Sequence, residues 1–271
     1  MSIEKVYDTV AKHYNQDLSE TVLRSANVTA QNLITKHTTP DDIQSLLALG
    51  IGDGIHIKPY KELFPKAHVG GIDISSNMLK KAQSVLACET YHGDISDAVQ
   101  LTKGQQFNLT IAHFVCAYVE PNIILSQAKS LTMNDGYVSL VTNTFNSFPK
   151  IMAAYQKYAT SKSLIATQLR KHIDATFETV FVPQDMNDLK QKFASHQLKI
   201  IDEKEMTIEV DFEDSSALYD FFMQGGWFAS GLVHPLISAN FVRFSFKKLV
   251  EKHLNFPFRD TMNIAVVLGQ K

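Results

Sequence analysis

The chain has 271 residues, 20% of them charged, and a formal net charge of −2. Its hydrophobic content of 45% is ordinary for a folded globular protein and too high for a disordered one. The near-neutral charge excludes a broadly basic nucleic-acid-binding protein. No apolar run reaches the length of about 18 residues that a membrane span needs.

The cysteines and the N-terminal residues bear on the compartment. Two cysteines, Cys88 and Cys116, are too few for a disulfide framework or a cysteine-based zinc site. The first eight residues carry acids where a signal peptide has an apolar run. No pair among the ten histidines shows the His-Glu-x-x-His spacing of a zinc enzyme. These features predict a cytoplasmic protein with reduced thiols and no bound metal.

The first 45 residues predict helices, because apolar residues such as Val6, Val10 and Tyr14 recur at a spacing near 3.6. A Pro-Asp-Asp stretch at 40–42 ends this pattern. The apolar run Ser45–Leu49 follows and leads into glycine, which is typical of a buried parallel strand.

The stretch from residue 59 to residue 143 alternates between helical and strand-like patterns. Strands that alternate with helices of about 10 residues indicate βαβ units and a parallel sheet. The predicted elements are, in order, a helix at 59–64, a strand at 67–74, a helix at 77–86, strands at 89–92 and 107–112, a helix at 121–131 and a strand at 137–143.

Beyond Pro149 the pattern changes. Residues 150–195 and the aromatic-rich residues 214–254 predict helices, whereas 198–210 and 261–268 predict strands that pair as a closing hairpin. No linker composition separates these segments, so we expect a single domain over 1–271. Its expected parts are N-terminal cap helices at 1–45, a ligand-binding core at 46–145, and variable helical substrate or lid insertions at 146–197 and 211–258.

The most informative stretch is Leu-Gly-Ile-Gly-Asp-Gly at 49–54, between a predicted strand and a predicted helix. Gly50, Gly52 and Gly54 permit a tight turn and a close approach of the backbone to a ligand. The N–H groups at the start of the following helix favour an anionic or polar ligand group. For this stretch alone, a glycine-rich turn without a ligand is the alternative.

Two acids stand at or just past the ends of the next two predicted strands. Asp73 comes about 20 residues after Gly54, where a carboxylate can accept both hydroxyls of a ribose. Its alternative role is to cap the next helix, for which Ser75 or Ser76 is better suited. Asp94 can accept from an exocyclic amino group, or it can serve a Gly-Asp turn. Three such loops in successive βα units predict one ligand site.

These loops resemble those of the class I S-adenosylmethionine-dependent methyltransferases, in the branch that acts on small molecules. The resemblance covers roughly half of the chain, and its most specific part is Asp-Ile-Ser-Ser-Asn-Met-Leu at 73–79. The motifs that carry it are Leu-Gly-Ile-Gly-Asp-Gly at 49–54, Gly-Ile at 71–72 before that run, His-Gly-Asp at 92–94, Phe-Asn-Leu at 107–109, Tyr-Val-Glu-Pro at 118–121, and Tyr7-Asp8 with Tyr14-Asn15.

The resemblance implies a Rossmann-like α/β fold, with a doubly wound, mostly parallel seven-stranded sheet, a reversed last strand and helical lid insertions. It implies S-adenosyl-L-methionine as the cofactor. The glycines would pass beneath its methionine and ribose, Asp73 would hold the ribose hydroxyls, and Asp94 would accept from the adenine amino group. The implied cofactor-binding residues are Tyr14, Gly50, Gly52, Gly54, Asp73, Ile74, Met78, Asp94, Ile95 and His113.

Two positions depart from the pattern of the family. The family usually has an acid where Ala48 stands, and often has Asp where Asn108 stands. Without the first acid, the chain lacks a partner for the amino group of the cofactor. A non-catalytic module that holds the adenosyl cofactor is therefore an alternative to an enzyme.

An NAD(P)-dependent oxidoreductase is a further alternative, which the loop disfavours. Dinucleotide-binding loops carry Gly-x-Gly-x-x-Gly, whereas this loop has Gly-x-Gly-x-Gly at 50–54. Asp53, at the open helix start, would repel a pyrophosphate.

The sequence predicts in-line methyl transfer to a small-molecule or carrier-linked acceptor. Ala-His-Phe-Val at 112–115 lacks the Asn/Asp-Pro-Pro-Tyr signature that grips the amino group of a nucleobase. The malonyl-carrier methyltransferases of biotin synthesis are one candidate resemblance. The candidate catalytic residues are His113, just past the fourth strand, and His234, in the predicted lid.

Two features of the C-terminal half have a simple and a functional interpretation. The aromatic residues between 212 and 246 predict core packing of amphipathic helices, with a lid over an apolar acceptor as the alternative. Basic residues cluster between 241 and 259, where a solvated helix face is the simpler interpretation and a docking patch for an acidic carrier the alternative. These basic residues are Arg243, Lys247, Lys248, Lys252 and Arg259.

Overall fold

The computed structural model describes residues 2–10, 19–160, 167, 170, 180–224, 227 and 239–271. The chain forms two compact units. The sheet unit comprises Thr21–Phe145, Phe181–Met206 and Asn263–Lys271, and the helical unit comprises Met1–Glu20, Asn146–Val180 and Thr207–Met262. The single domain with two insertions stays a prediction.

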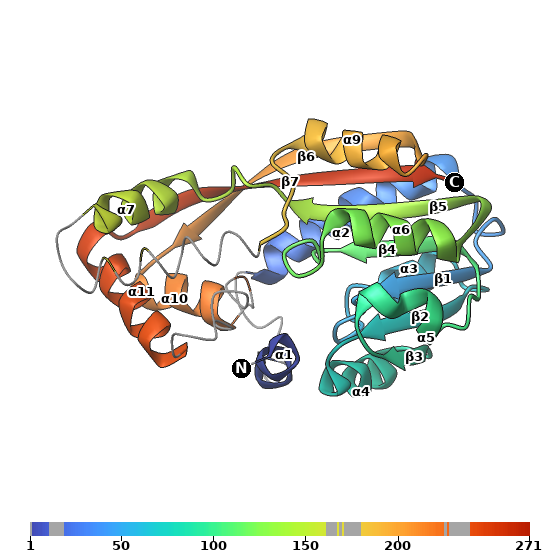
Figure 1. Cartoon of the computed structure of the whole chain (residues 1–271), viewed down its shortest axis with the longest axis horizontal. Helices are drawn as coiled ribbons and strands as arrows, with labels where there is room; N and C mark the ends of the chain where they lie inside the picture. Colours follow the sequence, from blue (N-terminus) through green and yellow to red (C-terminus); the bar gives the residue numbers. More distant parts are fainter. Residues whose placement is uncertain are drawn as a thin grey trace. The chain divides into compact units, whose positions relative to one another are not determined.

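Seven strands form one sheet in the order β3-β2-β1-β4-β5-β7-β6 (Figure 1). The pairs β1–β2, β1–β4, β2–β3 and β4–β5 are parallel, whereas β7 runs antiparallel to β5. The predicted Rossmann-like sheet with a reversed last strand is confirmed. The strands are β1 (Ser45–Leu49), β2 (His68–Asp73), β3 (Glu89–His92), β4 (Phe107–His113), β5 (Thr132–Asn143), β6 (Lys199–Phe212) and β7 (Phe258–Gln270).

The strand β1 occupies the position in the sheet that places a ligand site. Leu46 of β1 lies opposite Val69 of β2 on one side and Leu109 of β4 on the other. The strand order reverses at this point, from β1 to β2 and β3 in one direction and to β4 and β5 in the other. In such sheets, ligands bind at the carboxyl ends of the strands beside the reversal.

Two apolar cores hold helices against the two faces of this sheet. Leu46 and Ala48 belong to the core that contains residues of α2, α3 and α4, whereas Leu47 and Leu49 belong to the core with residues of α5, α6 and α9. Successive side chains of a strand point to opposite faces, which explains this division. The helices are α2 (Ser19–His37), α3 (Lys58–Leu63), α4 (Ser76–Val85), α5 (Ala98–Leu101), α6 (Pro121–Leu131) and α9 (Met186–Ser195).

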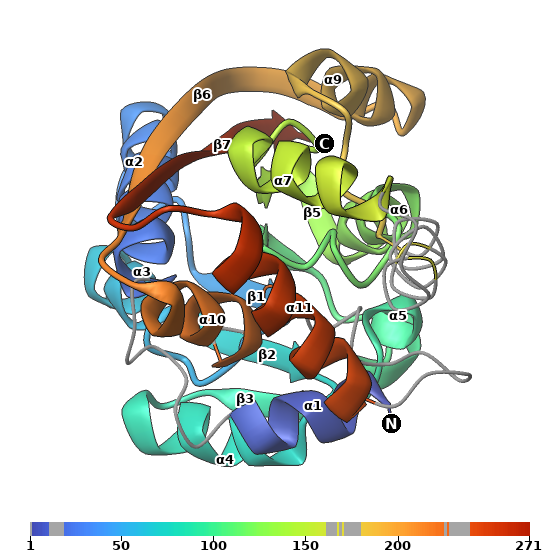
Figure 2. The same cartoon turned by 90° about the vertical axis from the view of Figure 1, so that its left-hand side faces the viewer.

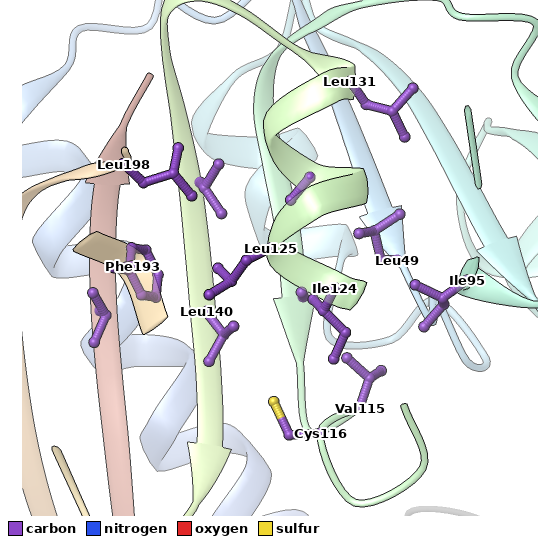
Figure 3. Close-up of a cluster of buried hydrophobic side chains, with 14 of the residues drawn as sticks. Leu49, Ile95, Val115, Cys116, Ile124, Leu125, Leu131, Leu140, Phe193 and Leu198 are labelled. Atoms are coloured by element: carbon purple, nitrogen blue, oxygen red, sulfur yellow. The ribbon is translucent and has the colours of Figure 1, made fainter. Parts of the chain in front are cut away.

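The core around α6 is shown in Figure 3. Ile124, Leu125 and Leu131 recur at helical spacing and are fully buried, so one face of α6 covers the sheet. Phe193 of α9 and Leu198 close the same core beside β7 and β5 (Figure 3). The predicted helix at 121–131 matches α6 residue for residue.

The strand β5 begins earlier than the sequence predicts, at Thr132 instead of residue 137. Its pairing with β4 shifts register between Phe107 and Leu109, and Asp135 has a φ angle of +63°. The polar residues of this irregular start interrupt the apolar alternation on which the prediction rests. The alternation therefore marks only the regular part of the strand.

The helical unit has an aromatic core. The ring of Phe221 packs against Phe212 and Trp227, with centroids 5.5 Å and 5.7 Å apart, and Phe148 meets Phe222 at 5.0 Å. Phe212 and Phe221 are fully buried, which supports core packing for these aromatic residues. The helices of this unit are α1 (Ile3–Val10), α7 (Pro149–Ala159), α10 (Ser215–Gln224) and α11 (Ala239–His253), of which the last two lie side by side (Figure 2).

Among the helices that the structure describes, none combines the length and the apolar character required to cross a membrane. Within the predicted helical stretch at 214–254, the described residues form α10 and α11.

A buried carboxylate caps α7. Phe148, at the N-cap, has a φ angle of +57° and provides no side-chain cap. Asp260 of β7 is 1% exposed and accepts from the N–H of Lys150 at 3.3 Å and of Ile151 at 2.9 Å. The negative charge of Asp260 at the start of the helix also interacts favourably with the helix dipole. Asp260 therefore ties α7 to the first residues of β7.

Removing this cap is expected to destabilise the chain. Asp260→Ala leaves two backbone N–H groups without their acceptor, which costs about 1–3 kcal/mol in the free energy of unfolding. Urea denaturation measures the effect. Glu213→Ala is the control, because Glu213 is an exposed acid in the same unit, and it should change the free energy by less than about 0.5 kcal/mol. Equal losses in the two variants would show that Asp260 does not act as a cap.

Candidate functional site

Three glycines shape the loop after β1. Gly50, Gly52 and Gly54 have φ angles of +76°, +58° and +80°, a region that favours glycine. The N–H groups of Gly50 and Ile51 both donate to the carbonyl of Ile72, at 2.9 Å each. The loop backbone therefore lies directly against the carboxyl end of β2.

Asp73 ends β2 and joins the glycine loop to the next helix. Its Oδ2 atom accepts from the N–H of Gly52 at 2.9 Å, and Oδ1 accepts from the N–H of Ser75 at 2.9 Å. Each carboxylate oxygen keeps a second lone pair, so the group can still accept two hydroxyls. Burial raises the pKa of this carboxyl, while its backbone hydrogen bonds and His92 oppose that rise. The two acceptor oxygens of Asp73 fit the two neighbouring hydroxyls of a ribose.

Side chains cap the helical segments that follow the next two strands. Ser75 is the N-cap of α4, where its Oγ accepts from the N–H of Met78 at 3.2 Å. The prediction that a serine caps this helix is confirmed. Asp94 caps a short turn, where Oδ1 accepts from the N–H and the hydroxyl of Ser96 at 2.8 Å each. That turn uses only one oxygen of Asp94.

The apolar residues predicted to contact adenine differ in accessibility. Met78 is 1% exposed and Ile95 7% exposed, whereas Ile74 is half-buried. Ile74 is therefore the most accessible of the three, with Ile95 packed in the core beneath the edge of the sheet. Their contacts with a cofactor stay predictions.

His113 ends β4 with both ring nitrogens in hydrogen bonds. Nδ1 lies 2.8 Å from Oδ1 of Asn27 on α2, and Nε2 lies 3.0 Å from Oγ of Ser139 on β5. Burial and the nearby His56 lower the pKa of this imidazole to about 3. The ring is therefore neutral near pH 7. The predicted catalytic role of His113 stays a prediction, and this geometry does not favour it.

Sequence reasoning missed Asn27 and Ser139. Asn27 lies in a helix and is only 4% exposed, so a polar residue on the apolar face of a helix is the signal that could have found it. Ser139 lies within β5 at 1% exposed, among apolar neighbours in sequence. Neither residue belongs to a motif, and the fold alone brings them to His113.

The two departures from the family pattern lie at different ends of the strands. Oδ1 of Asn108 accepts from the N–H of Gln44 at 3.1 Å and from the N–H and hydroxyl of Ser45 at 3.0 Å each. This contact is at the amino ends of β1 and β4, away from the glycine loop, and an amide oxygen makes it as a carboxylate would. Ala48 lies near the carboxyl end of β1, 1% exposed in an apolar core.

Tyr14 and His234 lie outside the described residues, and their predicted roles stay predictions. Within the described part of the chain, no group of three or more His, Cys, Asp or Glu side chains could hold a metal ion.

Three of the five basic residues between 241 and 259 have acidic partners, namely Lys247, Lys248 and Arg259. Lys247 and Lys248 contact Glu251 at 3.9 Å and 3.2 Å. The guanidinium of Arg259 forms ion pairs with Asp211 and a second acid of β6. These pairs favour the interpretation of a solvated surface over a docking patch.

Known structures share this fold. A family model described as a methyltransferase domain matches residues 44–208, and no curated protein matches the chain in sequence. The structure is similar to YcgJ of Bacillus subtilis, with 12% identity, a TM-score of 0.53, and 89% of this chain and 96% of that chain covered. It is also similar to a Bacillus halodurans protein with a provisional methyltransferase assignment, with 14% identity, a TM-score of 0.55, and 89% and 98% covered.

A substitution at Gly54 tests the geometry of the loop. A Cβ atom there would lie 2.9 Å from Cα of Ala82, in the backbone of α4, at a φ angle of +80°. We expect Gly54→Ala to shift the loop and to weaken binding of S-adenosylmethionine by about tenfold or more, which is about 1.4 kcal/mol. Isothermal titration calorimetry measures this affinity.

Gly104→Ala is the matched control for that variant. Gly104 has a φ angle of +72°, but nothing lies within 4 Å of an added Cβ. The control therefore carries a similar backbone strain, about 1 kcal/mol or more, without the clash. Its affinity should equal that of the wild type. A similar loss of affinity in both variants would contradict the role assigned to the loop.

The lowered pKa of His113 predicts how stability depends on pH. The unfolded imidazole takes up a proton below about pH 6.5, whereas the folded one does so only near pH 3. The contribution of His113 is therefore complete above pH 6.5 and decreases as the pH falls toward 3. Between pH 7 and pH 5 the loss is at most about 2 kcal/mol. His113→Asn, which does not titrate, should lose less stability over this range, and equal pH slopes would contradict the assignment.

Proposed function

We propose that this chain, which belongs to the methyltransferase-domain family and uses S-adenosyl-L-methionine, transfers a methyl group to a small-molecule acceptor. The observation that supports this most strongly is the contact between the first two loops. The N–H of Gly52 donates to Oδ2 of Asp73 at 2.9 Å. This bond holds the glycine turn beside a carboxylate whose remaining lone pairs suit a ribose.

The residues at this edge fit an adenosyl cofactor better than a dinucleotide. Asp53 is 4% exposed, and its Oδ1 accepts from the N–H of Ile55 at 3.2 Å. A pyrophosphate needs such N–H groups and is repelled by a carboxylate beside them. A sulfonium carries no phosphate and tolerates a neutral ring such as that of His113.

The protein contributes mainly position. When bound, S-adenosylmethionine supplies a methyl group on a cationic sulfur, which passes in line to the acceptor atom and leaves S-adenosylhomocysteine. Asp73 and the glycine loop would fix the ribose end, with Ile74 beside the adenine. Alignment of this kind can supply much of the rate acceleration, and a hydroxyl acceptor would also need a base, whereas a carboxylate would not.

A free small molecule is the acceptor class that we propose. The net charge of −2 gives no attraction to nucleic acid, and residues 112–115 lack the signature that grips a nucleobase. The pairing of Lys247 and Lys248 with Glu251 leaves less charge for docking an acidic carrier. A carrier-linked acceptor is therefore the second class to assay. A cytoplasmic location, expected from two free cysteines, belongs to the same proposal.

The substitution Asp73→Asn tests the site. The amide keeps one acceptor oxygen, so either the N–H of Gly52 or that of Ser75 loses its acceptor, and urea denaturation is measured in parallel to show that the variant stays folded. The amide has one acceptor oxygen where the carboxylate has two, so it cannot serve both ribose hydroxyls. We expect the affinity for S-adenosylmethionine to fall by about 10- to 100-fold, equivalent to about 1.4–2.8 kcal/mol. Calorimetry with S-adenosylmethionine and S-adenosylhomocysteine measures the change.

Asp41→Asn is the control for this variant. The side chain of Asp41 is 75% exposed and pairs only with Lys66 at the surface, before the amino end of β1. The affinity of Asp41→Asn for the cofactor should equal that of the wild type. Unchanged affinity in Asp73→Asn would refute the ribose assignment. Binding of NADH in place of S-adenosylmethionine by the wild type would refute the proposed function, and binding without methyl transfer to a broad acceptor panel would favour the non-catalytic module.

A further inference from the structure

A partly buried chain of hydrogen bonds joins α2 to the carboxyl-terminal halves of β4 and β5. Nδ2 of Asn27 donates to the carbonyl of Leu23 at 2.8 Å, and Oδ1 of Asn27 lies 2.8 Å from Nδ1 of His113. Nε2 of His113 lies 3.0 Å from Oγ of Ser139. Asn27 and Ser139 are 4% and 1% exposed, and all four residues belong to the sheet unit.

The position of each proton in this chain follows from the amide of Asn27. Because Nδ2 donates to the carbonyl of Leu23, Oδ1 faces His113, and an amide oxygen only accepts. Nδ1 of His113 must therefore carry a proton and donate it. In a neutral ring Nε2 then has a free lone pair, which accepts from the hydroxyl of Ser139. With its proton on Nδ1, the neutral ring satisfies all three hydrogen bonds and leaves its Nε2 lone pair engaged by Ser139.

The surroundings of the ring also oppose a second proton. Tyr60 is fully buried and meets the imidazole edge-on, with ring centroids 5.9 Å apart. The hydroxyl of Tyr60 donates to the backbone carbonyl oxygen of Asn27 at 3.5 Å. Burial penalises the charged form of the ring, and it is the larger effect on its pKa. The nearby His56 acts in the same direction, because its protonated form would repel an imidazolium.

We propose that Asn27 and Ser139 hold His113 as a neutral positioning residue, with its proton on Nδ1, and that His113 does not act as the base for the methyl acceptor. The proposal rests on the proposed function, because it concerns the edge of the sheet where S-adenosylmethionine would bind. A neutral ring leaves that edge free of a charge that would repel the sulfonium. Asn27 acts through His113 by fixing α2 against the end of β4.

The protonation state of His113 can be measured without any ligand. Nuclear magnetic resonance of 15N-histidine-labelled protein reports which ring nitrogen carries the proton, and the signals of His113 are those missing from His113→Asn. We expect the Nδ1–H form, with no titration between pH 5 and pH 8. An Nε2–H form, or a midpoint inside that range, would overturn the proposal.

Cofactor affinity distinguishes positioning from a role in folding alone. Asn27→Leu removes the acceptor for Nδ1 with a side chain of the same branching, and Ser139→Ala removes the donor to Nε2. We expect Asn27→Leu to weaken binding of S-adenosylmethionine by about tenfold or more, and Ser139→Ala by about three- to tenfold. Asn32→Leu is the matched control, because Asn32 is an exposed asparagine of α2, and it should bind as the wild type does. Equal affinities of Asn27→Leu and Asn32→Leu would overturn the proposal.

A conservative replacement of His113 gives an independent readout. The amide of His113→Asn can still donate to Oδ1 of Asn27, whereas His113→Leu cannot. We expect His113→Asn to retain cofactor affinity within about threefold of the wild type and His113→Leu to lose about tenfold. Equal cofactor affinities of His113→Asn and His113→Leu would contradict a positioning role. If the wild type binds no S-adenosylmethionine at all, the proposed function fails, while the resonance measurement still decides the protonation of His113.

Discussion

The hydrogen bond from the N–H of Gly52 to Oδ2 of Asp73, at 2.9 Å, is the contact on which the candidate site depends. It exists because β1 and β2 pair in parallel with Leu49 opposite Ile72, so the loops that follow the two strands leave the sheet side by side. The positive φ of Gly52 then turns its N–H toward the carboxylate. Without this register, the glycine turn and the acid would be separate features with no common ligand.

A second constraint places α2 at the same edge of the sheet. Asn27 and His113 come from segments far apart in the sequence, and their 2.8 Å contact holds a helix against the end of β4. The contact is partly buried, and replacing one partner leaves the other without this hydrogen bond. Polar contacts of this kind specify one arrangement where apolar packing alone tolerates several. The edge is therefore formed by one glycine loop, one carboxylate and one neutral imidazole.

Much of the sheet unit was predictable from the sequence, because local periodicity and the loop motifs agree there. The helix at 121–131, the cap at Ser75 and the position of Asp73 at the end of β2 all follow from patterns within a few residues. The irregular start of β5 was not predictable in this way. Nor was the Asn27–His113 contact, because pairing over such a sequence separation depends on the folded chain and leaves no local pattern.

The loop motifs of the candidate site lie in the sheet unit. Motif spacing predicts the cofactor edge, whereas the aromatic residues around Phe221 belong to no motif and pack as a core. A crystal structure of the chain with S-adenosylhomocysteine would test the central claim most directly. We predict that both ribose hydroxyls lie within hydrogen-bonding distance of the Asp73 carboxylate, with the ribose against the glycine loop at 50–54 and Gly52 still bonded to Oδ2. A ribose bound elsewhere, or an Asp73 turned away from it, would contradict this account.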